Sequence, residues 1–185
     1  MTAAANAPIT DAQLALALAN EAGALLLALR RDGSADPAAL GDAADKASND
    51  LLLGAIARQR PGDAILSEES PDTAARLSAR RVWIIDPLDG TREYSAGRDD
   101  FAVHVALLED GRLAAAAVAQ PARGRAIATD APPPLPAEAA PLRIAISRSR
   151  APDLVHRVAS ATGAELLPMG SAGAKTLSVL FGEAD

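Results

Sequence analysis

Apolar positions recur at helical spacing along the N-terminal third of the chain. Thr10 precedes the first run and Gln13 follows it by three residues, the pattern of a capping box, so a helix is predicted to begin there. A second helix is predicted from Pro37, with Asp36 as its cap, to the stop signal at Pro61. The leucines predicted to form the buried face of the first helix are Leu14, Leu18, Leu25 and Leu29.

The middle of the chain alternates short apolar runs with turn signals, which is typical of strands. AILSEES (64–70) is a short strand that runs out into acidic residues, and RVWIID (81–86) is apolar at consecutive positions, which predicts burial on both faces. Two β-rich runs within residues 99–121 flank Asp110-Gly111, a hairpin signal. RGRAIATD (123–130) can add a further strand.

A Pro/Ala-rich stretch at 131–141 has no periodicity and is interpreted as a linker loop. Beyond it the pattern predicts a strand at 142–147, a helix around 153–162, a strand at 165–170 and a helix from Ala172. The prediction is an α/β layered sandwich. An N-terminal α+β domain (1–130) packs two helices on a mostly antiparallel sheet, and a linker (131–141) leads to a partial C-terminal α/β domain (142–185).

Composition narrows the function classes. The 185 residues are 49% hydrophobic and 23% charged, which is typical of a globular chain. The absence of cysteine excludes disulfides and thiolate metal sites and favours a reducing, cytoplasmic setting. The net charge of -6 argues against a nucleic-acid binder. Neither a signal peptide nor an apolar run of about 18 residues that would span a membrane is expected.

Two aspartates stand where the most apolar strand is predicted to end. Asp86 and Asp89 can point at one site, and Glu68 at the end of another strand can join them. Carboxylates that close repel one another unless a cation or a shared proton is present. Mg²⁺ is the natural cation, since it prefers oxygen ligands and binds together with phosphate. Gly90-Thr91 then opens a helix whose backbone N–H groups form an anion site. The pattern indicates phosphoryl transfer or phosphate hydrolysis.

Simpler interpretations exist for each piece taken alone. An isolated Asp-Pro or Asp-Gly is usually a turn, and the EES segment is most often an exposed acidic loop or a helix cap. The set order SEES (67–70) followed by WIIDPLDGT (83–91) favours a joint site.

These motifs carry a family resemblance. WIIDPLDGT after an upstream SEE resembles the signature of the inositol monophosphatase superfamily of Mg-dependent, lithium-sensitive phosphatases. The longer string DPLDGTREYSAGRDDFAVHVAL (86–107) is more similar to the CysQ-type 3′(2′),5′-bisphosphate nucleotidases. The resemblance runs along essentially the entire chain. It implies the sugar phosphatase or inositol monophosphatase-like fold, two or three Mg²⁺ ions as cofactor, and Li⁺ as an inhibitor.

The resemblance also implies roles for particular residues. Glu68 would ligate metal and hold the attacking water, Asp86 would bridge two metals, and Asp89 would bind one of them. The main-chain carbonyl of Leu88 would be a further ligand. The predicted metal ligands are Glu68, Asp86, Leu88 and Asp89, the catalytic residues are Asp45, Thr91 and Glu68, and the substrate-binding residues are Glu68, Leu88, Asp89, Gly90, Thr91 and Ser171.

Asp45 is the helix aspartate expected to pair with Thr91 and activate the water. The AAD segment at 43–45 matches the family's T-A-A-D, although Asp42 and Asp50 compete for this position and an exposed helix carboxylate is the simpler interpretation.

Other positions carry weaker signals. Arg92 and Arg98 can contact a second phosphate of a substrate, although exposed arginines are more often solvated. His104 is interpreted as a packed or surface histidine rather than a ligand. Ser171, in MGSAGAK (169–175), is expected to contact the sugar or ring of the substrate and also to cap a helix.

The family's C-terminal W-D-x-A-A motif, whose aspartate binds metal and a substrate hydroxyl, has no match, because the single tryptophan is Trp83. The expectation is a fragment or truncated product that binds one metal better than the second.

The leading hypothesis is a Mg-dependent phosphatase acting on 3′-phosphoadenosine 5′-phosphate or a related sulfonucleotide, which REYS (92–95) favours. The alternatives are an inositol monophosphatase or fructose-1,6-bisphosphatase activity, and a weak or inactive remnant. The expected partner is a small phosphorylated substrate, either a nucleotide bisphosphate or a sugar or inositol phosphate, and not a nucleic acid polymer. A homodimer is the assembly considered.

Overall fold

The computed structural model describes residues 9–33, 36–137 and 140–185, so interpretations of residues 1–8 and of 138–139 in the linker lie outside it. The elements are α1 Asp11–Asp32, α2 Pro37–Gln59, β1 Ala64–Ser67, η1 Ala74–Leu77, β2 Arg81–Asp89, α3 Thr91–Ser95, β3 Ala102–Glu109, β4 Arg112–Gln120, η2 Pro121–Arg123, β5 Arg125–Ala128, β6 Arg143–Ser147, α4 Asp153–Thr162, β7 Glu165–Met169 and α5 Ala172–Leu180.

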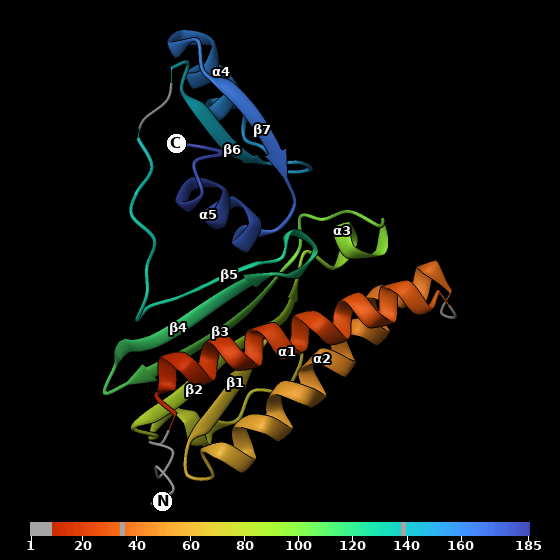
Figure 1. Cartoon of the computed structure of the whole chain (residues 1–185), viewed down its shortest axis with the longest axis vertical. Helices are drawn as coiled ribbons and strands as arrows, with labels where there is room; N and C mark the ends of the chain where they lie inside the picture. The colour runs from red at the N-terminus through yellow and green to blue at the C-terminus, as the bar shows by residue number, and fades with distance from the viewer. Residues whose placement is uncertain (1–8, 34–35, 138–139) are drawn as a thin grey trace, which may run out of the picture.

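Two sheets organise the molecule (Figure 1). The larger has the order β1-β2-β3-β4-β5, with β1 parallel to β2 and the other pairs antiparallel, and the smaller pairs β6 with β7 in parallel. The predicted α/β layered fold is confirmed, and so is the hairpin: Asp110 and Gly111 both have positive φ, as a tight turn between β3 and β4 requires. The domain boundaries at 130 and 141 stay predictions.

Helices α1 and α2 cover one face of the larger sheet, and α5 lies between its other face and the β6–β7 unit (Figure 1). Val103 and Val105 on β3 belong to the core with α1 and α2, whereas the backbone at Gly173 on α5 lies against Ala102 and His104. Because successive side chains on a strand point to opposite faces, β3 serves both layers.

Helix α1 is a core helix. Its predicted capping box is present, with Thr10 and Gln13 each accepting from the other's backbone N–H. Leu14, Leu18 and Leu26 are fully buried, whereas Leu25, predicted for the buried face, is only half-buried, because the i, i+4 series from Leu14 continues to Leu26. By length and composition alone, α1 could also cross a membrane, which the sequence-based expectation did not foresee. Its apolar stripe here packs on the sheet.

Helix α3 is held against α1 by Tyr94, which also forms an aromatic pair with Phe101. The Tyr94 hydroxyl donates to the Leu26 carbonyl at 2.7 Å, and its ring meets Phe101 edge-on with centroids 5.1 Å apart. The Arg30 guanidinium lies over the Phe101 ring. Such pairs stabilise beyond the area that they bury. The short helix after the aspartates therefore has a fixed position.

Strand β2 contains a bulge at the position that matters most. The sequence predicts that this strand ends at Asp86, but it continues to Asp89 with a register shift, so that Asp86 pairs with His104 and Asp89 with Ala102. Ile85 and Leu88 both face the helical core. In a regular strand, residues three apart face opposite sides. The extra residue of the bulge returns Asp89 to the same side as Asp86.

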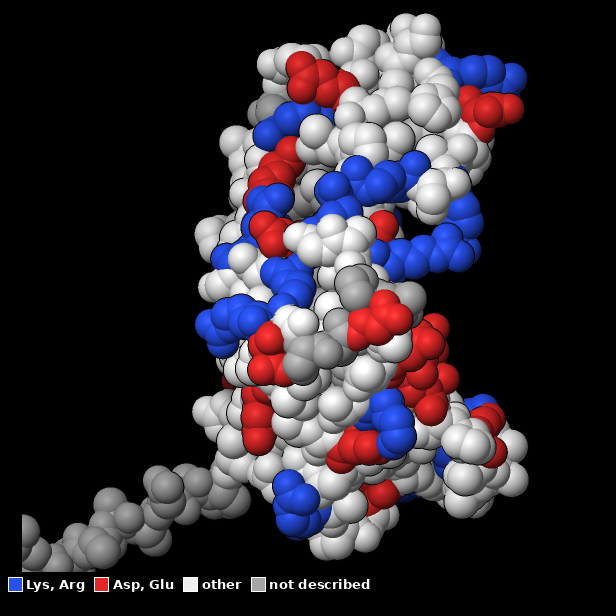
Figure 2. Space-filling view, turned by 90° about the vertical axis from the view of Figure 1, so that its right-hand side faces the viewer, with Lys and Arg blue, Asp and Glu red and all other residues white. Residues whose placement is uncertain are grey.

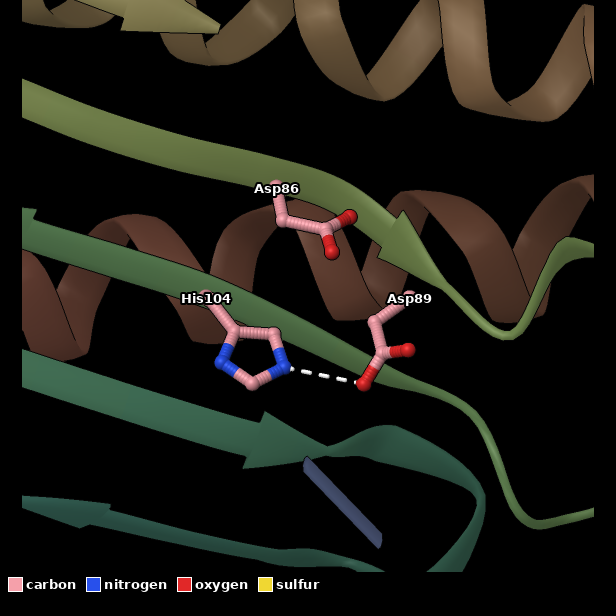
Figure 3. Close-up of side chains that lie close together, drawn as sticks. All are labelled: Asp86, Asp89 and His104. Atoms are coloured by element: carbon pink, nitrogen blue, oxygen red, sulfur yellow. Dashed lines mark hydrogen bonds and ion pairs between the residues drawn. The ribbon is translucent and has the colours of Figure 1, made fainter. Parts of the chain in front are cut away.

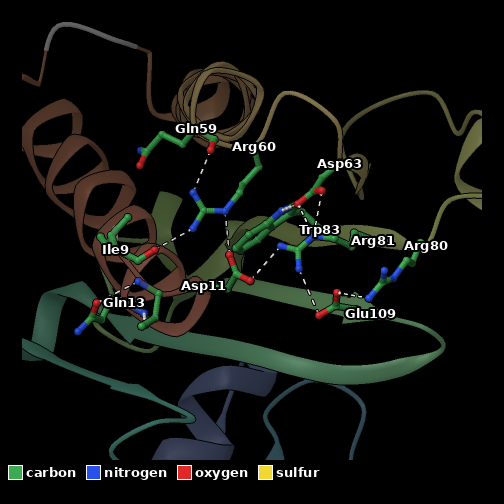
Figure 4. A network of polar contacts seen from close by, with 11 residues as sticks. Ile9, Asp11, Gln13, Gln59, Arg60, Asp63, Arg80, Arg81, Trp83 and Glu109 are labelled. Atoms are coloured by element: carbon green, nitrogen blue, oxygen red, sulfur yellow. Dashed lines mark hydrogen bonds and ion pairs between the residues drawn. The ribbon is translucent and has the colours of Figure 1, made fainter. Parts of the chain in front are cut away.

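A network of ion pairs closes the end of the sheet away from the bulge (Figure 4). The Arg81 guanidinium contacts Asp11 at 2.9 Å, Asp63 at 3.0 Å and Glu109 at 3.2 Å. Asp63 also accepts from the Trp83 indole N–H at 2.8 Å. These contacts join the start of α1, the α2–β1 turn, β2 and β3.

The Arg81→Ala variant removes the centre of this network. We expect a loss of about 1–3 kcal/mol in the free energy of unfolding, since three partly buried carboxylates lose a charged donor. Urea unfolding measures it. The control is Lys46→Ala, which breaks the exposed pair of Lys46 with Asp50 and should stay within about 0.5 kcal/mol of the parent. Equal losses would contradict the assigned role of Arg81.

Asp100 joins the larger sheet to the β6–β7 unit. Its buried carboxylate accepts from Arg98 at 2.7 Å, from Arg148 at 2.8 Å and from the Gly170 backbone N–H at 2.9 Å. Burial opposes ionisation of Asp100, but these hydrogen bonds outweigh it and hold its pKa below the usual range. The charged form is therefore the one that links the two units.

The contribution of Asp100 to stability should depend on pH. A carboxyl group with a lowered folded-state pKa stabilises fully above its unfolded pKa and loses that contribution as pH falls through the folded pKa. We therefore expect Asp100→Asn to be less stable than the parent at pH 7 and the difference to shrink as pH falls below about 4. Unfolding curves of both proteins across this range measure it. A difference independent of pH would show that the charge of Asp100 is not what links the units.

Candidate metal and phosphate site

Asp86 and Asp89 project from the bulge of β2 toward His104 on β3 (Figure 3). His104 Nε2 lies 3.0 Å from Asp89 Oδ2, and one donor atom from each of the three residues lies within 4.8 Å of the others. His104 is half-buried and hydrogen-bonded, which agrees with its interpretation as a packed residue. That interpretation did not foresee its contact with a predicted metal ligand.

Asp89 ties three parts of the chain together. Its Oδ2 accepts from His104, from the Ser171 hydroxyl at 2.6 Å and from the Gly173 backbone N–H at 2.6 Å. Burial raises the pKa of Asp89, but these donors outweigh burial and bring it down to about 2. For His104 the shifts have the opposite signs. Burial lowers its pKa, but the neighbouring carboxylates outweigh burial and raise that pKa. Among the described residues the bonds of Asp89 involve Oδ2, which leaves Oδ1 for a ligand.

Asp45 reaches the same site from α2. Thr91 Oγ1 lies 3.3 Å from Asp45 Oδ2 and 3.1 Å from the Leu88 carbonyl oxygen. Helices α2 and α3 can approach this closely because α2 has a glycine, Gly41, where they meet. A Cβ at Gly41 would lie 2.8 Å from Thr91 Cγ2. The predicted pairing of Asp45 with Thr91 is therefore present as geometry. Its competitors lie elsewhere, since Asp42 is exposed and Asp50 pairs with Lys46.

The carboxylates of the site oppose one another's ionisation. Burial, followed by Glu69 and Asp86, raises the pKa of Asp45 to about 7. Burial, followed by Asp89, raises the pKa of Asp86 to about 7, although His104 acts against it. Asp45 Oδ1 is buried and has no hydrogen-bond partner among the described residues. Repelling carboxylates with an orphaned oxygen beside them fit a hard divalent cation such as Mg²⁺, which keeps bound waters that such an oxygen can accept from.

These groups open into one cleft of about 410 Å³. Every predicted site residue except Ser171 lines it: Asp45, Glu68, Asp86, Leu88, Asp89, Gly90 and Thr91. Ser171 is fully buried behind Asp89 and caps α5 by accepting from the Ala174 N–H, so its capping role is confirmed. Its substrate-binding role stays a prediction.

Gly90 shapes the wall where a phosphate would lie. It has φ 94° and is the N-cap residue of α3. A Cβ there would come within 3.1 Å of the Asp100 carbonyl oxygen and of Ser171 Cβ. Glycine is therefore required both for the left-handed backbone and for the close approach. With no side chain on the N-cap residue, the N–H groups that begin α3 remain for another acceptor.

The cleft also contains residues that sequence reasoning missed. They are Glu69, Glu93, Ser147, Ser149, Arg150 and Gly170. Ser147, Ser149 and Arg150 belong to SRSR (147–150), which begins with the last residue of β6, and a polar run at a strand end is the signal that could have found them. Arg92 lines the cleft, whereas Arg98 lines a neighbouring cleft and pairs with Asp100.

Comparisons with known proteins agree with this geometry. Residues 6–132 match the inositol monophosphatase family. The chain is 48% identical to the 3′-phosphoadenosine 5′-phosphate phosphatase of Mycobacterium leprae, covering 97% of this chain and 72% of the relative. It is 47% identical to the protein of the same name from Mycobacterium bovis, covering 89% and 66%. The chain thus spans 66% to 72% of the length of these relatives.

Solved structures share the fold. CysQ from Bacteroides thetaiotaomicron has a TM-score of 0.76 at 23% identity, covering 96% of this chain and 78% of that one. A staphylococcal inositol monophosphatase-II with bound 2′AMP has a TM-score of 0.74 at 22% identity, covering 92% and 70%. At such identities the likeness concerns the fold alone, and the family rests on the sequence match. The chain belongs to the inositol monophosphatase family.

Proposed function

We propose that this cleft hydrolyses a phosphate monoester in 3′-phosphoadenosine 5′-phosphate or a related sulfonucleotide, in a Mg²⁺-dependent reaction in the cytoplasm. The observation that carries the proposal is the convergence of Asp45, Asp86 and Asp89 beside the start of α3. The names of the mycobacterial relatives support the substrate class.

Glu68, Asp86, Asp89 and the Leu88 carbonyl would hold the cation. When bound, Mg²⁺ would neutralise the phosphate and ease the loss of a proton from water. The carboxylates provide the negative charge that binds the cation. The backbone N–H groups that follow Gly90 would donate to the phosphate oxygens that do not face the cation.

Asp45 and Thr91 would handle the proton of the attacking water. A general base works best when its pKa lies near the working pH, and the pKa of Asp45 is raised to about 7. Thr91 has a single hydroxyl proton to share between Asp45 and the Leu88 carbonyl. With that proton directed to Asp45, the Thr91 oxygen can accept a hydrogen bond from the water, and as the water gives its proton to Thr91 the hydroxyl proton of Thr91 moves to the Asp45 carboxylate.

Phosphate release tests the proposal directly. The chain should release phosphate from 3′-phosphoadenosine 5′-phosphate with Mg²⁺ and not with a chelator, and faster than from inositol 1-phosphate or fructose 1,6-bisphosphate. A preference for either of the latter would favour an alternative substrate class. Absence of release from all of them would overturn the proposal.

Asp45→Asn should lower kcat by about 10²- to 10⁴-fold while changing KM little, because it removes a proton acceptor rather than a ligand-binding contact. Steady-state phosphate release measures both constants. Asp42→Asn is the matched control, since Asp42 lies on the same helix but is exposed. Equal effects of the two substitutions would remove Asp45 from the mechanism.

Asp86→Asn should abolish Mg²⁺-dependent turnover and yet stabilise the metal-free chain. Because the folded-state pKa of Asp86 is raised to about 7, its ionisation costs stability as pH rises from about 4 to above 7. We expect a gain on the order of 1–4 kcal/mol in the free energy of unfolding at pH 8 in chelator, and little gain at pH 5. Urea unfolding with Asp130→Asn as the exposed control measures it, and a loss of stability at pH 8 would contradict the repulsion.

A further inference from the structure

His104 lies behind the carboxylate site rather than in it. Asp86 and Asp89 line the cleft, whereas His104 is not among the described residues that line it. Its Nε2 atom lies 3.0 Å from Asp89 Oδ2 (Figure 3). The imidazole is therefore placed to act on the contents of the cleft through Asp89.

The bulge that brings the two aspartates together also brings His104 within reach of Asp89. His104 is the cross-strand partner of Asp86, and the side chains of directly paired residues lie on the same face of a sheet. Asp89 returns to that face because the bulge adds one residue. The contact of His104 with Asp89 thus follows from the same irregularity as the site itself.

Three donors from two parts of the fold meet at one oxygen of Asp89. His104 Nε2 comes from β3, whereas the Ser171 hydroxyl and the Gly173 backbone N–H, both at 2.6 Å, come from the start of α5. A Cβ on Gly173 would lie 2.6 Å from His104 Nε2, so glycine leaves the room that the ring occupies. Because all three contacts are made to Oδ2, the plane of the carboxylate is fixed while Oδ1 stays available.

An acidic cluster needs such donors. The face in Figure 2 has acidic side chains gathered at mid-height, and within the site Asp89 opposes the ionisation of Asp86. Carboxylates that repel one another are stable side by side only when a cation or hydrogen bonds hold them. Hydrogen bonds behind a metal-ligating carboxylate orient it toward the metal.

Direct ligation of the cation is the competing role for His104. One donor atom from each of Asp86, Asp89 and His104 lies within 4.8 Å of the others. However, Nε2 faces a carboxylate oxygen, which only accepts, so Nε2 carries the proton of this hydrogen bond. A ring nitrogen that carries a proton has no lone pair for a metal ion. The geometry therefore favours a role through Asp89.

We propose that His104 is a positioning residue for the cation. By holding Oδ2, it orients the Asp89 carboxylate and leaves Oδ1 to a bound Mg²⁺. The inference rests on the proposed function only where that function places a cation beside Asp89, and it does not depend on turnover.

Calorimetric titration of the metal-free chain with Mg²⁺ alone at pH 8 tests the proposal. His104→Leu and His104→Gln fill similar space, but only glutamine keeps an N–H donor. We expect His104→Leu to raise the Kd for Mg²⁺ by about 10- to 100-fold, the usual loss when a group that orients a metal ligand is removed. His104→Gln should bind Mg²⁺ more tightly than His104→Leu. Equal losses in the two variants would show a role in packing and overturn the proposal.

The same titrations with Ni²⁺ distinguish positioning from ligation. Asp89 offers an oxygen to either ion, so the loss of its orientation should weaken the binding of Mg²⁺ and Ni²⁺ by a similar factor. Imidazole is a far better ligand for Ni²⁺ than for Mg²⁺. A much larger loss for Ni²⁺ in His104→Leu would show that His104 ligates the metal itself, and would overturn the positioning role.

The matched control is the other histidine of the chain. His156 is exposed on α4 and lies outside the cleft. His156→Leu should leave the Kd for both ions unchanged, and a loss equal to that of His104→Leu would contradict the proposal. Urea unfolding in chelator establishes that each variant is folded before its titration.

A parallel assay of phosphate release separates this inference from the phosphatase proposal. A Kd that rises in His104→Leu but not in His156→Leu supports the positioning role even in a parent chain that releases no phosphate, and that parent would overturn the phosphatase proposal alone. Unchanged or tighter Mg²⁺ binding in His104→Leu would overturn the positioning role whatever the turnover. A parent chain that binds no Mg²⁺ would overturn both.

Discussion

In a regular strand, residues three apart point to opposite faces of the sheet. The site requires that Asp86 and Asp89, which are three apart, point to the same face. The bulge in β2 makes this possible, because it adds one residue between them. Leu88 still faces the core while both carboxylates face the cleft. Pro87, which has no N–H to donate, is tolerated at such a bulge, and its carbonyl accepts from Ser48 on α2. The chemistry of the cleft depends on this local irregularity being fixed from both sides.

The cleft lies between the larger sheet with its helices and the β6–β7 unit, and residues of both line it. Asp89 receives the Ser171 hydroxyl and the Gly173 N–H from the β7–α5 turn, and Asp100 receives Arg148 and the Gly170 N–H from the same unit. Two aspartates of the first unit thus accept most of the polar contacts from the second. Because Asp89 belongs to the carboxylate cluster, docking of the second unit also fixes the orientation of that carboxylate.

Local sequence signals predicted most of the helices and strands. Capping residues, Asp-Gly turns and the spacing of apolar residues each depend on only a few neighbouring residues. Thr10, Pro37 and Asp110-Gly111 lie where the sequence predicts them. The bulge, the contact of His104 with Asp89 and the place of Arg150 in the cleft were not predicted. Each depends on which strands pair, and in which register, across separations far longer than any local pattern. Leu25 shows the same limit on a helix, since spacing alone did not distinguish it from Leu26.

The cluster of carboxylates is unfavourable for the metal-free fold and favourable for the proposed chemistry. Burial and mutual repulsion raise the pKa values of Asp45 and Asp86 to about 7, so a neutral solution does not ionise both fully without a cation. A divalent ion would reverse that balance, and its binding energy would then add to the stability of the folded chain. The pairs at Arg81 and Asp100, which lie outside the cluster, offset the cost in the absence of metal. The same carboxylates that weaken the metal-free fold would therefore make a bound cation part of the most stable form of the protein.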